Sequence, residues 1–261
     1  MTKKVLVVDN DFFFVEFLTE LLENKGYDVI KAYDGKEGIS KLEEGTFDIL
    51  FADLIMPKID GLQLIKFARR KSSESHPAVI AISDTLIEQM DDVKTIGADY
   101  CVVKGPIEGM TKTLNDLLNN LQDHGLTQSG SGQFVEPGKL YPRQATAELI
   151  KELKFQKAVF DSVGIGILVV DRDARVMNAN VMALELINKP LEEVLNLRVT
   201  AVFPQEGRGR LVEALREVAK NLNLLRRRSL RLKYGSQELK LVASILRIGN
   251  DLDGWVLTME V

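Results

Sequence analysis

The chain has 261 residues, of which 45% are hydrophobic and 28% are charged, and this composition is typical of globular proteins and excludes a disordered chain. A single cysteine, Cys101, excludes an internal disulfide framework and fits a reducing cytoplasm, and no apolar run is long enough to span a membrane. Residues 1–125 carry a net charge of −8 and residues 126–261 one of +4, which suggests two units with different partners.

The first 121 residues alternate short apolar runs with amphipathic helical stretches. Strands are predicted at Lys4–Val8, Tyr27–Lys31, Asp48–Ala52, Ala78–Ile82 and Tyr100–Val103. Helices are predicted at Phe13–Lys25, Lys36–Glu44, Gly61–Lys71, Leu86–Ile96 and Ile107–Leu121. Five strand–helix repeats indicate an α/β fold, with a doubly wound five-stranded parallel sheet that helices cover on both faces.

Four polar residues stand where four of the apolar runs end, namely Asp9, Asp53, Ser83 and Lys104. Parallel strands end at the same edge of their sheet, and open α/β sheets bind ligands there. Two carboxylates, a hydroxyl and an ammonium group at one edge can hold a divalent cation and a phosphoryl group. A carboxylate such as that of Asp53 can attack phosphorus, but it needs a cation because the phosphoryl group is also anionic.

The motifs VLVVDND, FDILFADLIMPKIDG, AVIAISD and GADYCVVKG resemble the receiver domain of bacterial response regulators, a flavodoxin-like fold, over residues 1–121. The resemblance implies that Asp53 accepts a phosphoryl group from a sensor histidine kinase, and that Ser83 and Lys104 read the phosphorylated state. It also implies a Mg²⁺ ion held by Asp9, Asn10, Asp53 and the main-chain carbonyl of Ile55.

The sequence departs from the receiver pattern at four positions. Asn10 replaces the second acid of the acidic pair, and Asp84 adds a negative charge directly after Ser83. Cys101 stands where an aromatic switch residue is common, and Gly105 replaces the usual proline. Since an amide oxygen can still ligate Mg²⁺, we expect weakened phosphorylation; the alternative is a degenerate receiver that binds partners without being phosphorylated.

Residues 122–143 are rich in Gly, Ser and Pro, which predicts a linker. Residues 144–163 follow as an amphipathic helix whose spacing of 3 and 4 resembles a coiled coil, at Thr146, Leu149, Leu153, Gln156, Phe160 and Val163. The pattern predicts either a homodimer through this helix or a helix packed on its own domain.

Residues 164–261 are predicted to form a small α+β domain with an antiparallel sheet. The expected strands are Gly166–Asp171, Arg175–Asn178, Leu225–Tyr234, Glu238–Ile248 and Gly254–Glu260, and the expected helices are Asn180–Asn188, Leu191–Leu195 and Gly209–Leu222. The segment FDSVGIGILVVDRDARVMNANVMALELI resembles the opening of a PAS domain, and the resemblance runs to the end of the chain. It implies a sensor or dimerisation module.

We expect no cofactor in this domain, because His76, His124 and Cys101 all lie outside it. A small apolar ligand stays possible, and the expected interior residues are Ile167, Val169, Met177, Met182, Leu186, Val202 and Leu257. The basic run from Arg226 to Lys233 is interpreted as a solvated strand face, since no DNA-binding motif accompanies it.

Together these patterns predict a cytoplasmic response regulator of a phosphorelay that contains no kinase or output enzyme. The alternative is a receiver–PAS scaffold that acts only by protein binding.

Overall fold

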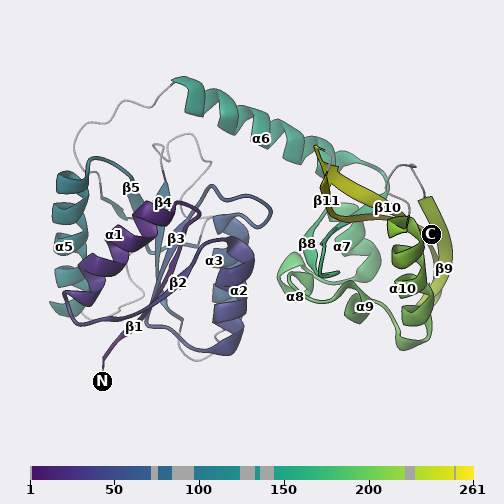
Figure 1. Ribbon diagram of the computed structural model, residues 1–261, viewed down its shortest axis with the longest axis horizontal. Helices are drawn as coiled ribbons and strands as arrows, with labels where there is room; N and C mark the ends of the chain where they lie inside the picture. Colours follow the sequence, from purple (N-terminus) through teal and green to yellow (C-terminus); the bar gives the residue numbers. More distant parts are fainter. Residues whose placement is uncertain are drawn as a thin grey trace. The chain divides into compact units, whose positions relative to one another are not determined.

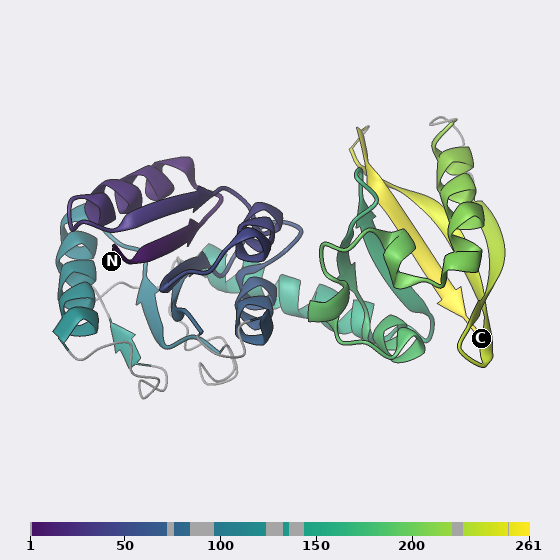
Figure 2. The same ribbon diagram turned by 90° about the horizontal axis from the view of Figure 1, so that it is seen from below.

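The computed structural model describes residues 2–71, 76–83, 97–123, 133–135, 144–220, 227–249 and 251–261, with side chains left out for residues 122–151. The chain divides into two compact units, Met1–Glu152 and Leu153–Val261 (Figures 1 and 2). Each unit has its own sheet. Within the described part of the chain, no helix combines the length and the hydropathy that a membrane span requires.

The first unit has a parallel sheet in the order β2-β1-β3-β4-β5-β6. Its strands are β1 (Lys4–Val8), β2 (Asp28–Ala32), β3 (Ile49–Asp53), β4 (Ala78–Ser83), β5 (Tyr100–Val103) and β6 (Gln133–Val135). The first five have the order of a flavodoxin-like sheet, so the predicted doubly wound fold is confirmed. The three-residue strand β6 pairs with β5 and falls within the segment that the sequence predicted as a linker.

The helices of this unit cover both faces of the sheet. They are α1 (Phe12–Glu23), α2 (Gly35–Glu44), α3 (Gly61–Lys71) and α5 (Ile107–Asp123). Figure 1 shows α1 and α5 on one face and α2 and α3 on the other. Burial on both faces explains why every residue of β3 and β4 is buried and why these strands are almost continuously apolar. The predicted helix at Leu86–Ile96 lies outside the described residues, as does Asp84.

The second unit begins within α6 (Gln144–Ser162) and has an antiparallel sheet, as expected from the sequence, with the strand order β8-β7-β11-β10-β9. The strands are β7 (Gly166–Asp171), β8 (Val176–Ala179), β9 (Arg227–Tyr234), β10 (Gln237–Ile248) and β11 (Asp251–Glu260). Between β8 and β9 lie α7 (Val181–Ile187), α8 (Leu191–Val194), α9 (Val199–Val202) and α10 (Gln205–Ala219), of which the sequence did not predict α9.

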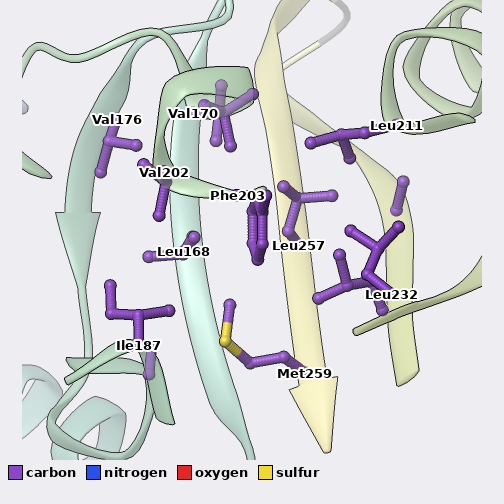
Figure 3. Packing of buried hydrophobic residues seen from close by; sticks show 14 of the residues in the cluster. Leu168, Val170, Val176, Ile187, Val202, Phe203, Leu211, Leu232, Leu257 and Met259 are labelled. Atoms are coloured by element: carbon purple, nitrogen blue, oxygen red, sulfur yellow. The ribbon is translucent and has the colours of Figure 1, made fainter. Parts of the chain in front are cut away.

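The core of the second unit lies between one face of the sheet and these helices. Figure 3 shows the buried ring of Phe203 among apolar side chains that include Leu168 and Leu257. Two residues predicted in the interior, Ile167 and Val169, lie on the opposite face of β7 and are partly exposed. The error has a simple cause, because β7 has four consecutive apolar residues, Ile167 to Val170, and no polar residue to indicate its outer face.

Candidate functional site

The carboxyl ends of β1, β3 and β5 bring three charged side chains together. Asp9 and Asp53 are only 1% and 2% exposed. The Nζ atom of Lys104 lies 2.8 Å from Oδ2 of Asp9 and 3.6 Å from Oδ1 of Asp53. Ser83 is fully buried at the end of β4, between β3 and β5. The structure thus places all four predicted residues at one edge of the sheet.

The loop after β3 holds Asp53 through close backbone packing. The N–H of Leu54 donates to the carbonyl of Ile82 on β4 at 2.9 Å. The chain then turns back so tightly that a Cβ atom on Gly61 would lie 2.1 Å from the carbonyl oxygen of Asp53. Only glycine fits there without moving the Asp53 backbone, so Gly61 positions Asp53.

The helix that begins at Gly61 is fixed by a reciprocal cap. The N–H of Gln63 donates to Oδ1 of Asp60 at 2.8 Å, and the N–H of Asp60 donates to Oε1 of Gln63 at 3.0 Å. This is the capping-box arrangement with an acid at the N-cap. The sequence IDGLQ therefore ends the loop at a defined residue and stabilises the turn that carries Asp53.

Burial and opposite charge act against each other at Asp9. Burial raises the pKa of the Asp9 carboxyl, and the ammonium group of Lys104 opposes that rise. Oδ1 of Asp9 also accepts a hydrogen bond from the N–H of Asp11 at 2.8 Å. Two buried carboxylates facing one ammonium group leave an excess of negative charge, which a cation would neutralise.

The side-chain amide of Asn10 lies beside Asp53. When the amide is oriented so that both of its ends have partners, its NH₂ group donates to Oδ2 of Asp53 at 3.3 Å and to the carbonyl of Ile55 at 3.2 Å. These two oxygens therefore converge on one point, and Asp9 contributes a carboxylate nearby.

Such a set of oxygens fits Mg²⁺, which is commonly bound by one or two carboxylates and several waters. The acidic ligands are few, since no group of three or more His, Cys, Asp or Glu that could hold a metal occurs among the described residues. The predicted ligands would be Asp9, Asn10, Asp53 and the Ile55 carbonyl.

The sequence interpretation missed an aromatic cluster at the same edge. Phe12 and Phe13 are 56% and 83% exposed, and the Phe12 ring stacks on Tyr33 with centroids 5.7 Å apart. The ring of Phe14 instead lies 4.8 Å from Nζ of Lys104, a cation–π contact that helps to orient the ammonium group. Three consecutive phenylalanines were the available signal, because an amphipathic helix buries only one face.

Cys101, one of the departures from the receiver pattern, belongs to the core. It is fully buried on β5, and burial raises the pKa of its thiol to about 12. The group therefore stays a neutral thiol at physiological pH, and it has none of the features of a reactive cysteine.

Comparison with known proteins assigns both units. Residues 5–114 match the response regulator receiver domain, and residues 160–233 match the PAS fold. The chain contains a receiver domain followed by a PAS domain. Both resemblances inferred from the sequence are thereby confirmed.

The relatives of the chain include bacterial regulators. It is 36% identical over 106 residues to the alkaline phosphatase synthesis transcriptional regulatory protein PhoP of Bacillus subtilis, covering 40% of this chain and 43% of that protein. It is 34% identical over 103 residues to the response regulator ArlR of Staphylococcus saprophyticus, covering 39% and 45%. The chain thus spans less than half the length of these curated relatives.

Among solved structures, the chemotaxis response regulator CheY4 of Vibrio cholerae is 28% identical, with a TM-score of 0.41. The match covers 45% of this chain and 99% of that one.

Proposed function

We propose that the chain acts as a response regulator that accepts a phosphoryl group on Asp53 from a sensor histidine kinase. The observation that carries this proposal is the contact of Lys104 with both Asp9 and Asp53 at the carboxyl edge of the receiver sheet. An ordinary surface salt bridge leaves its carboxylates in solvent, whereas here two almost fully buried carboxylates share one ammonium group at the sheet edge where open α/β sheets bind ligands.

Transfer of the phosphoryl group to Asp53 needs few protein side chains. A carboxylate oxygen of Asp53 attacks the phosphorus of a phosphohistidine, a P–O bond forms, and the P–N bond breaks with its electron pair left on the histidine nitrogen. Mg²⁺ held by Asp9, Asn10, Asp53 and the Ile55 carbonyl would supply the positive charge that lets the two anions approach. Lys104 is close enough to pair with the new phosphoryl oxygens, and the Ser83 hydroxyl can donate to them once it turns outward.

The response to phosphorylation begins with a change in charge at Asp53. A phosphoryl group adds roughly −1.5 to −2 charges at neutral pH. Lys104 would move toward it and away from Asp9, changing the surface around the ends of β4 and β5. We infer that this surface and the connecting helix at residues 144–163 carry the state to the PAS domain, to which no cofactor is assigned, although a small apolar ligand could bind there.

The described part of α6 supports a homodimer. Phe155 and Val159 lie one helical turn apart on the same face, and both side chains are exposed. Pairing with α6 of a second copy in the cytoplasm would cover them. Light scattering of the full chain should then give twice the mass of one chain, and a monomer at micromolar concentration would contradict this assignment.

A phosphorylation-independent scaffold is the second candidate, and Asn10 is the observation that favours it. A neutral residue in the acidic pair lowers the charge available to hold a cation. The two candidates differ in whether Asp53 is ever modified.

Intact-protein mass spectrometry separates the two functions. With Mg²⁺ and a small phosphodonor such as acetyl phosphate, we expect the wild type to gain the mass of one phosphoryl group and Asp53→Ala to gain none. Asp28→Ala is the matched control, because Asp28 is an exposed acid at the start of β2. A wild type that takes no label from acetyl phosphate or from a phosphorylated kinase would establish the scaffold, and a labelled Asp53→Ala would place the acceptor elsewhere.

A further inference from the structure

The ring of Phe14 lies against the ammonium group of Lys104. The Nζ atom is 4.8 Å from the ring centroid, 2.8 Å from Oδ2 of Asp9 and 3.6 Å from Oδ1 of Asp53. The side chain of Lys104 is only 13% exposed, so little water is left around its charge. The face of an aromatic ring carries the negative part of its quadrupole and attracts a cation, most strongly where water is excluded. The ring is therefore an electrostatic partner of Lys104 besides the two carboxylates.

The start of α1 fixes the position of the Phe14 ring. Oδ1 of Asp11, the N-cap residue, accepts hydrogen bonds from the N–H groups of Phe13 at 2.9 Å and Phe14 at 3.3 Å. The N–H of Asp11 in turn donates to Oδ1 of Asp9 at 2.8 Å. The Phe14 ring also packs against the receiver core and lies 6.0 Å from the ring of Phe17. The cap and the packing thus place the ring beside the carboxyl edge of the sheet.

We propose that Phe14 is a positioning residue for phosphoryl transfer, whose ring holds the Lys104 ammonium group beside Asp9 and Asp53. The role deepens the proposed function and rests on it, because the ammonium group has to face Asp53 when a phosphoryl group arrives. A cation is attracted over a ring face within about 6 Å of the centroid, whereas a hydrogen bond weakens steeply as its angle falls. Lys104 can therefore move from Asp9 toward a phosphoryl group on Asp53 and stay in contact with the ring.

A leucine in place of Phe14 shows what the ring adds. It would pack on the same core, but it has no quadrupole that attracts a cation. The shorter ion-pair contact of Lys104 is the one with Asp9, so without the ring the ammonium group would leave Asp9 at a greater cost. We therefore expect the ring to speed phosphoryl transfer, and not only to stabilise the fold.

The test varies the electron density of the ring and leaves its shape almost unchanged. Phenylalanine analogues with increasing numbers of fluorine atoms, incorporated at position 14 of the full chain, progressively weaken the attraction of the ring face for a cation. With Mg²⁺ and acetyl phosphate, the rate of Asp53 labelling should fall stepwise along the series. Phe14→Leu should be labelled about threefold to tenfold more slowly than the wild type.

Position 17 supplies the matched control. Phe17 lies three residues further along α1, is partly buried as Phe14 is, and packs against the same core. The same analogues at position 17, and Phe17→Leu, should leave the labelling rate unchanged. A rate that is equal for all analogues at position 14, or that falls equally at both positions, would overturn the proposal, since packing alone does not follow the electron density of one ring.

A measurement without a phosphodonor separates this proposal from the proposed function. In NMR spectra of the wild type, the Lys104 side-chain signals next to Nζ should lie upfield of those of exposed lysines, because protons above an aromatic ring are shielded, and Phe14→Leu should remove the shift. Signals at the position of an exposed lysine would overturn the proposal even if Asp53 is labelled. A wild type that shows the shift but takes no label would contradict the proposed function and leave Phe14 as the group that positions Lys104.

Discussion

The two domains bury polar side chains for different purposes. In the PAS domain, Oδ1 of Asn180 accepts from the N–H groups of Ile167 and Ala183, and its Nδ2 donates to the carbonyls of Phe160 and Ile165. All four hydrogen bonds of this amide are therefore made with main-chain groups. In the receiver domain, the buried charges contact one another, as the distances from Lys104 to Asp9 and Asp53 show.

This difference distinguishes buried polar groups with a structural role from those with a functional role. A buried amide that satisfies four main-chain groups is explained by the fold, because those groups would otherwise lose hydrogen bonds inside the protein. Two carboxylates that approach one ammonium group must be desolvated, and the contacts with Lys104 only partly offset that cost. We infer that a ligand, and not the fold, accounts for their arrangement.

Asn180→Ala should have the largest effect, and only on the PAS domain. It leaves up to four main-chain groups without their partner, so we expect the free energy of unfolding to fall by about 3 kcal/mol or more. The chain has a single tryptophan, Trp255 on β11, so urea denaturation followed by its fluorescence reports on this domain. Asn10→Ala is the control and should leave that transition unchanged. A loss below about 1 kcal/mol would show that the four hydrogen bonds of Asn180 contribute little to the stability of the PAS domain.

Gly61→Ala should act next most strongly, and on the receiver domain. A Cβ atom 2.1 Å from the Asp53 carbonyl forces the loop to move, so we expect a loss of about 2–4 kcal/mol and a fall of at least about tenfold in the rate of Asp53 labelling. Acetyl phosphate labelling and hydrogen exchange of β3 measure the two effects.

Gly45→Ala is the matched control, because its Cβ would have open space and its backbone is extended. Alanine generally favours helices over glycine, so a Gly61→Ala protein that is as stable and as readily labelled as the wild type would refute the positioning role.

The sequence predicted the receiver fold and the place of its site because both depend on local pattern. Strands such as β3 and β4 are buried on both faces, so their apolar runs are unambiguous, and the residue after each run must lie at the sheet edge. The same reasoning was wrong at β7, because four successive apolar residues do not indicate which face of the strand is buried. The approach of the Asn10 amide to the Ile55 carbonyl was also beyond prediction, since it depends on where folding places the two groups.

Asp9→Asn should have the smallest effect, and it should stabilise the receiver domain instead of destabilising it. Burial raises the pKa of Asp9, so the ionised carboxylate is less favourable in the folded chain than in the unfolded one at neutral pH, even with Lys104 beside it. The amide removes the charge and keeps one acceptor, for the N–H of Asp11, while Lys104 loses Oδ2 of Asp9 and retains Asp53 as a partner. We expect the receiver to gain about 1 kcal/mol in Mg²⁺-free buffer, measured by hydrogen exchange of β1, while Mg²⁺ binding is lost. Asp28→Asn, at an exposed position, should change neither quantity. A less stable Asp9→Asn protein would show that the ion pair outweighs desolvation, and the receiver site would then be as structural as the Asn180 network.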